Sequence, residues 1–93
     1  MGTAILKLKM MPKSPDTDLE KMKQGIREKI EAHGGVLNPT EPFEEQEIAF
    51  GLKSLTATFA WPEEKDTDLA ENSAAEVEGV SSVEIVDYRR AMG

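Results

Sequence analysis

The sequence contains no cysteine, a single histidine and no long apolar run. Without cysteine, disulfide frameworks, thiolate metal sites and cysteine nucleophiles are excluded. One histidine excludes a multi-histidine metal centre. The short apolar runs exclude a bilayer-spanning helix, and the amino terminus lacks the apolar stretch of a secretory signal. We therefore expect a cytoplasmic protein that does not associate with membranes.

The 93 residues suffice for one small domain, which we expect to extend over residues 1–93. The net charge is −7, and it is unevenly distributed: residues 1–40 carry +2 and residues 41–93 carry −9. An acidic chain argues against binding to a phosphate backbone, which depends on clustered Lys and Arg. A basic protein partner fits this charge better. The alternative is a solvated acidic surface that keeps the chain in solution.

The first third of the chain has the pattern of a strand followed by a helix. Apolar and polar residues alternate over residues 3–11, as in a half-buried strand. Thr17 and Glu20 have capping-box spacing, and apolar residues follow at intervals of three and four, which predicts a helix reaching His33. We expect Gly34 to end this helix, because glycine adopts the left-handed conformation at little cost.

Three more strands and one more helix are expected in the rest of the chain. We interpret residues 36–45 as an irregular, acidic connection with a short strand start, because they hold two prolines and three glutamates. Alternating apolar residues then predict two strands on either side of Gly51. A weaker helix is expected over residues 67 to about 78, ending at Gly79. The last strand, over residues 83–88, precedes two arginines and a short tail.

The predicted order is strand, helix, strand, strand, helix, strand. This order predicts an α+β fold, the ferredoxin-like βαββαβ sandwich, in which two helices cover one face of a four-stranded antiparallel sheet. The tetrapeptide Asp-Thr-Asp-Leu recurs at residues 16–19 and 66–69, at the start of each expected helix. This repeated tetrapeptide supports a fold made of two similar strand-helix-strand halves, although helix capping alone selects Asp and Thr at both places.

Sites for familiar chemistries are not evident in the sequence. RNA-recognition modules of this fold stack bases on aromatics of the open sheet face, where this chain offers residues such as Lys7 and Thr56. The connection over residues 11–15 has no glycine to cradle a phosphate. His33 is explained by its place at a helix end. An acidic cluster is best interpreted as solvated charge; its members are Glu41, Glu44, Glu45 and Glu47.

Phe50, Gly51, Arg89 and Arg90 are the remaining candidates. From the pattern alone, Phe50 is most simply a core aromatic, and the two arginines are solvated charges near the end of the chain. The alternation of apolar and polar residues assigns no further role to these four residues.

The segment IAFGLKSL, followed by TATFAW and by VEIVDYRR at the end, resembles the nucleotide-exchange domain of the translation elongation factor 1-beta family, especially its short archaeal form. The entry to the first helix, MMPKSPDTDLE, extends the resemblance over essentially the whole chain. The resemblance implies a ferredoxin-like domain that binds elongation factor 1-alpha and speeds release of its GDP.

The resemblance also implies roles for the remaining candidates. Phe50 would be the family's exposed aromatic, inserted against the partner near its nucleotide site, and Gly51 can bend the hairpin so that the ring leaves the core face. Arg90 falls where eukaryotic members place a lysine that approaches the magnesium and phosphate-loop region, with Arg89 beside it. The arginine side chain at this position is longer than that lysine, and its guanidinium is planar.

An exchange factor of this kind performs no covalent chemistry and is not an enzyme. We expect no cofactor, no bound metal, no direct contact with nucleic acid, and a monomer when the chain is free. The alternative that the residues leave open is a small regulatory or protein-interaction module of the same fold without exchange activity.

Overall fold

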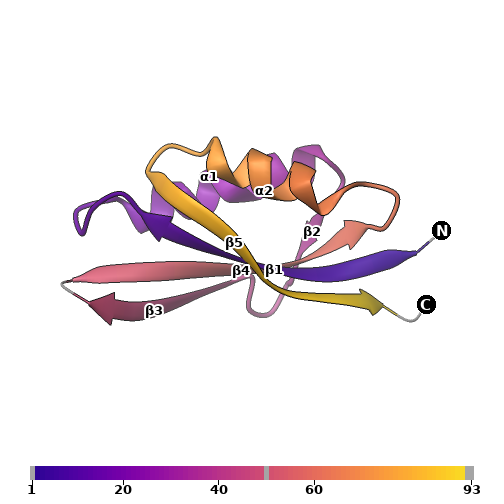
Figure 1. Ribbon diagram of the computed structural model, residues 1–93, viewed down its shortest axis with the longest axis horizontal. Coiled ribbons are helices and arrows are strands. Elements are labelled where there is room, and N and C mark those ends of the chain that lie inside the picture. Colours follow the sequence, from indigo (N-terminus) through magenta and orange to yellow (C-terminus); the bar gives the residue numbers. More distant parts are fainter. Residues whose placement is uncertain (1, 50, 92–93) are drawn as a thin grey trace.

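The computed structural model describes residues 2–49 and 51–91, which form one antiparallel sheet and two helices (Figure 1). The elements in chain order are β1 (Thr3–Pro12), α1 (Leu19–Ala32), β2 (Val36–Leu37), β3 (Phe43–Ala49), β4 (Leu52–Pro62), α2 (Thr67–Ala75) and β5 (Val80–Ala91). This arrangement confirms the predicted α+β class.

The sheet has β4 and β1 at its centre and β5 along one edge, in the order β2-β4-β1-β5. Strand β3 pairs with β4 on the same side as β2. Both helices lie against one face of the sheet, which we call the helix face (Figure 1). The opposite face is the open face. Its residues come from alternate positions of the strands, and they include Lys7 and Thr56, as the sequence pattern predicted.

The prediction of four strands is wrong for the described part of the chain, which forms five. The edge strand beside β4 is split into two. β2 pairs with the C-terminal part of β4, at Phe59 and Ala60, whereas β3 pairs with its N-terminal part. Between them, the side chain of Asn38 accepts hydrogen bonds from the backbone amides of Thr40 and Glu41. This turn interrupts the pairing, because the prolines at 39 and 42 lack amide protons.

The core lies between the helix face and the two helices. Alternate residues of β1 and β4 are fully or almost fully buried, as their spacing predicted, and meet the apolar stripe of α1. The Phe59 and Trp61 rings pack edge to face, with 5.8 Å between their centroids. The main core residues are Ala4, Leu6, Leu8, Met10, Met22, Ile26, Ile30, Leu55, Ala57, Phe59 and Trp61.

Helix α1 begins one residue later than the capping box predicts. Asp18 is the N-cap, and its Oδ1 accepts from the backbone amides of Glu20 and Lys21 at 3.0 and 3.3 Å. Thr17 instead accepts a hydrogen bond from the amide of Ser14, within the turn that follows β1. The other end agrees with the prediction, since the helix is capped at residue 33 and Gly34 has φ +89°.

Helix α2 is shorter than predicted, because it ends at Ala75 rather than near residue 78. The chain then turns through Glu76 to Gly79, which has φ +93°, and enters β5 at Val80. The small side chains of α2 bring it close to α1. A Cβ built on Gly25 of α1 would lie 2.7 Å from Cγ1 of Val77, so the packing of the two segments needs glycine there.

Strand β5 is longer than predicted and contains a bulge. Leu8 pairs with Ile85 and Lys7 with Asp87, which leaves Val86 as an extra residue. The bulge reverses the alternation, so that Tyr88 lies opposite the core residue Leu6 on the helix face. The prediction that Val86 and Tyr88 share the face opposite to Ile85 is therefore wrong for Tyr88.

Candidate functional site

The hairpin between β3 and β4 carries two of the candidate residues. Ala49 and Leu52 face each other across it, and Gly51 is exposed with φ +80°, a conformation that favours glycine. This value agrees with the expectation that Gly51 bends the hairpin. Phe50 lies outside the described residues, so its role stays a prediction.

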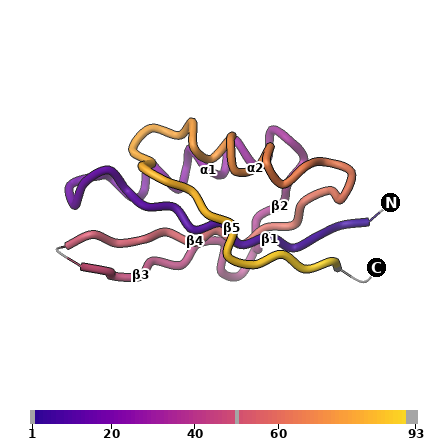
Figure 2. Tube along the Cα trace, viewed as in Figure 1, coloured from indigo at the N-terminus to yellow at the C-terminus, as the bar shows by residue number. Residues whose placement is uncertain are grey.

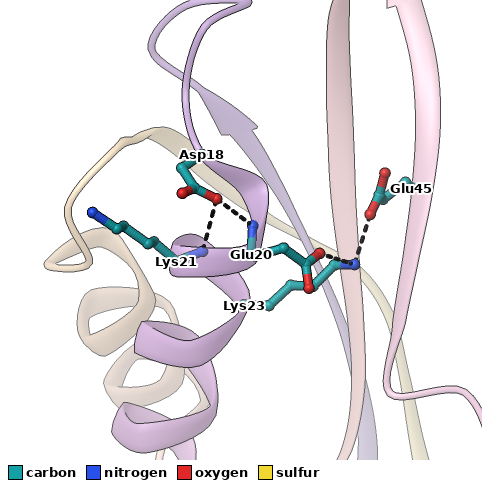
Figure 3. A network of polar contacts seen from close by, with 5 residues as sticks. All are labelled: Asp18, Glu20, Lys21, Lys23 and Glu45. Carbon is teal, nitrogen blue, oxygen red and sulfur yellow. Dashed lines mark hydrogen bonds and ion pairs between the residues drawn. The ribbon is translucent and has the colours of Figure 1, made fainter.

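A polar network ties this hairpin to α1 (Figure 3). Nζ of Lys23 lies 2.6 Å from a carboxylate oxygen of Glu45 in β3 and 2.9 Å from one of Glu20 in its own helix. The hydrogen bonds to Glu45 and Glu20 raise the pKa of Lys23 above its ordinary value, and the bond from Lys23 lowers the pKa of the Glu45 carboxyl. Glu45 is therefore a structural contact of the hairpin.

Interpretation of the whole acidic cluster as solvated charge does not predict this role of Glu45. Phe43 offers a signal that could have separated its members. Phe43, Glu45 and Glu47 share the helix face of β3 by register, and Phe43 packs partly buried against the core. The guanidinium carbon of Arg27 in α1 lies 5.9 Å from the Phe43 ring centroid. Alternation counted from Phe43 therefore points Glu45 toward the helix.

Arg89 and Arg90 belong to β5 rather than to a tail, because β5 continues pairing with β1 up to Ala91. Arg89 lies opposite Ile5 on the open face, and its Nε is 3.2 Å from Oδ2 of Asp87. Arg90 lies opposite Ala4 on the helix face, and its Nε is 3.5 Å from Oε1 of Glu63. Both arginine side chains are 78% exposed. The adjacent arginines thus point to opposite sides of the sheet.

The two groups of candidates lie at opposite ends of the molecule. The β3–β4 hairpin forms one end, and both termini lie at the other (Figure 2). Strand β4 joins the two ends, and its 11 residues correspond to about 36 Å of extended chain. The longest dimension of the molecule is 42 Å. The structure therefore does not bring Gly51 together with Arg89 and Arg90 at one compact site.

His33 and Trp61 also lie toward the terminal end, where they have structural contacts. Their rings meet edge to face with 6.3 Å between centroids. The ammonium of Lys65 donates to the His33 carbonyl at the end of α1, and the Trp61 indole donates to the carbonyls of Lys65 and Asp66 at 3.3 Å. These contacts satisfy the end of α1 and the turn before α2. They explain His33 without a catalytic role.

The described residues lack the groupings that hold ions or cross membranes. No cluster of three or more potential metal-ligating side chains occurs among residues 2–49 and 51–91. Over the same residues, neither helix is long and apolar enough to traverse a bilayer. A surface groove lies between α1 and the turn after α2, and side chains of both charges line it. Its lining includes Lys21, Glu28, Lys29 and Glu78.

The chain is similar to known proteins over almost its whole length. The family model described as the EF-1 guanine nucleotide exchange domain matches residues 5–91. Elongation factor 1-beta of Methanothermobacter thermautotrophicus is 41% identical over 93 residues, covering 99% of this chain and 100% of the relative. That of Methanosarcina barkeri is 41% identical, covering 97% and 99%, and that of Metallosphaera sedula is 38% identical, covering 97% of each. The chain belongs to the family of EF-1 guanine nucleotide exchange domains.

Proposed function

We propose that this chain promotes release of GDP from elongation factor 1-alpha, so that GTP can bind and translation elongation can continue. The observation that carries the proposal is the match of the exchange-domain model to residues 5–91, which includes both helices and all the described strands except the first two residues of β1. The relatives named elongation factor 1-beta align over nearly their full length as well.

The proposal assigns the two ends of the sheet to two contacts with one partner. Phe50, beside the left-handed Gly51, packs on the partner at the hairpin end. Arg90 approaches the partner at the terminal end. Because β4 separates these positions, a partner that touches both must cover the length of the sheet. This differs from the expectation that Phe50 also acts close to the nucleotide site, and it leaves Arg90 nearest to the nucleotide.

An added cation explains how contact at the terminal end can release nucleotide. GTPases hold GDP through phosphate-loop amides and a magnesium ion that compensates the phosphate charge. A guanidinium placed beside these groups competes for the same anionic ligands, which weakens the compensation that the nucleotide needs. The chain itself makes and breaks no covalent bond in this process, so we propose that it is not an enzyme.

Thermodynamic linkage gives the cycle its direction. If the exchange factor weakens nucleotide binding by some factor, nucleotide weakens binding of the exchange factor by the same factor. Rebinding of abundant GTP then displaces the exchange factor and frees it for another partner molecule. The affinity for nucleotide-free elongation factor 1-alpha is accordingly expected to exceed the affinity for the GDP-bound form.

The finer features of the proposal follow from this activity. We propose a ferredoxin-like domain that extends over residues 1–93, acts as a monomer in the cytoplasm where translation takes place, and contacts neither nucleic acid nor membranes directly. The proposal requires no cofactor or metal on this chain. The net charge of −7 favours a partner whose contacting surface is basic.

A GDP-release assay tests the proposal directly. Elongation factor 1-alpha is loaded with a fluorescent GDP and chased with excess unlabelled GTP, with increasing amounts of this chain. We expect the release rate to rise with the concentration of the chain and to saturate. If the chain binds the partner without changing the rate, it is an interaction module of the same fold instead.

A further inference from the structure

The end of β5 holds an arginine that already has a partner within the free protein. Nε of Arg90 lies 3.5 Å from Oε1 of Glu63, a residue of the turn between β4 and α2. The Arg90 side chain is 78% exposed, whereas that of Glu63 is 27% exposed. The carboxylate is therefore the more enclosed member of the pair, and the guanidinium is the more exposed one.

Glu63 is fixed by the start of β1. Its backbone amide donates to the carbonyl of Gly2 at 3.1 Å. Its carboxylate also lies over Gly2, so closely that a Cβ built on Gly2 would overlap Oε2. Thr3, the next residue, pairs with Pro62 on one side and Ala91 on the other, and Arg90 pairs with Ala4. The same few ladder pairs thus position both the acid and the arginine.

We propose that Glu63 is the positioning residue for Arg90 in nucleotide exchange. The contact uses Nε, which is close to the side-chain stem, so the two terminal nitrogens of the guanidinium are left to meet an anionic group of the partner. An exposed pair of this kind is weak and is readily exchanged for a better one. Glu63 therefore limits the orientations of Arg90 before binding without withdrawing the charge from the partner.

Arg89 provides the internal contrast for this role. Its Nε pairs with Asp87 on the same strand and the same open face, so the acid and the base move together. Arg90 is instead tied to a different loop, on the helix side of the sheet. The second arrangement joins the arginine to a segment outside its own strand. The inference rests on the proposed exchange activity, and it assigns to Glu63 a part in that activity.

The experiment compares Glu63→Gln with Glu64→Gln in the GDP-release assay. Both variants lose one negative charge at neighbouring positions of one turn, and Glu64 is exposed. At a subsaturating concentration of the chain, we expect Glu63→Gln to slow GDP release about two- to fivefold and Glu64→Gln to leave it unchanged. Glu63→Gln should raise the concentration of the chain that gives half-maximal release, and it should leave the maximal rate unchanged. The reason is that an unpositioned Arg90 can still reach the same bound state.

A second background shows whether Glu63 acts through Arg90. Once Arg90→Ala has removed the guanidinium, adding Glu63→Gln should have no further effect on release. An equal loss in both backgrounds would overturn the inference, because Glu63 would then act independently of Arg90. Faster release by Glu63→Gln would also overturn it, because the ion pair would then restrain Arg90 from the partner.

Two further measurements address the contact itself. The Nε–H signal of Arg90, assigned by its loss in Arg90→Lys, should shift in the ¹H–¹⁵N spectrum of Glu63→Gln and stay in place in Glu64→Gln. Gly2→Ala displaces the Glu63 carboxylate without changing any charge, and it should shift the same signal and slow release. If the signal stays in place in both Glu63→Gln and Gly2→Ala, the contact between Arg90 and Glu63 is contradicted. Failure of the parent chain to speed release at all would overturn the proposed function, and the inference would fall with it.

Discussion

The hairpin end and the terminal end of the sheet present their candidate residues by different means. At the hairpin end, a left-handed glycine sets the backbone direction, and Lys23 of α1 holds the neighbouring strand through Glu45. At the terminal end, pairing of β5 with β1 decides which side each arginine faces, and one exposed ion pair orients Arg90. An aromatic ring that packs against a partner needs a fixed backbone position. A charged side chain acts over a longer range and therefore tolerates more variation in its position.

The sharpest test of the comparison places two phenylalanines side by side. Phe59 is 1% exposed, so Phe59→Ala should lower the free energy of unfolding by about 3–5 kcal/mol. We expect Phe50→Ala to cost well under about 1 kcal/mol and yet to slow GDP release more than tenfold. Chemical denaturation and the release assay measure the two effects. A loss of stability by Phe50→Ala as large as that of Phe59→Ala, with normal release, would place the ring in the core.

The terminal end is tested by substituting its two arginines one at a time. Arg90→Ala should slow GDP release about tenfold, whereas Arg89→Ala, which changes the open face, should change it less than about twofold. Arg90→Lys distinguishes a point charge from a planar two-pronged contact, since lysine retains the rate only in the first case. If Arg90→Ala releases GDP as fast as the parent at equal occupancy of the partner, the hairpin end carries the whole effect.

Point substitutions are preferable here to removal of residues 89–93. The sequence pattern places the arginines beyond the last strand, which would make such a truncation nearly harmless to the fold. In the structure, Arg89, Arg90 and Ala91 pair with Ile5, Ala4 and Thr3. A truncation would therefore expose one side of β1 as well as delete the cations.

Two glycines with positive φ test whether hairpin geometry matters beyond stability. Gly51 at the hairpin end has φ +80°, and Gly34 after α1 has φ +89°. Replacing either by alanine should cost about 1 kcal/mol of unfolding free energy, because a Cβ disfavours this conformation. Gly51→Ala should also slow GDP release, whereas Gly34→Ala should not. Equal release rates for the two variants would mean that the hairpin tolerates redirection.

The smallest expected effect concerns the ion pair of the hairpin. The hydrogen bond from Lys23 lowers the pKa of the Glu45 carboxyl in the folded chain. A lowered folded-state pKa stabilises the fold above the unfolded value, near 4.5, and this contribution is lost as the pH falls through the folded value. Because the pair is partly exposed to solvent, Glu45→Gln should cost only a few tenths of a kcal/mol at neutral pH.

Denaturation at several pH values checks this prediction. The difference in stability between the parent and Glu45→Gln should shrink as the pH is lowered below the unfolded pKa of the carboxyl. Glu44 lies on the open face of the same strand, so Glu44→Gln serves as the matched control and should show no such difference. A pH-independent difference for Glu45→Gln would attribute the effect to packing rather than to charge.

Most of the fold could be predicted because its signals are local. Alternation in β1, the apolar stripe of α1 and the left-handed Gly34 each depend on a few neighbouring residues. The split of β2 from β3 and the bulge at Val86 could not, because they depend on which strand lies alongside. The contacts of Glu45 with Lys23 and of Glu63 with Arg90 join residues far apart in sequence, and no local pattern specifies such pairs.

The bulge at Val86 has a consequence for how this family can change. Over residues 82–85, between the bulge and an earlier register shift, odd-numbered residues of β5 face the helices, and downstream of the bulge even-numbered residues do. Deleting Val86 would restore strict alternation and leave both arginines on their present sides, because Arg90 would still pair with Ala4. Inserting one residue between Tyr88 and Arg89 would instead exchange the sides of the two arginines, because Arg89 would then pair with Ala4 and face Glu63. A single codon gained between the bulge and the arginines therefore acts as a double substitution at the end of the strand, even though no arginine has been mutated, whereas loss of the bulge residue does not.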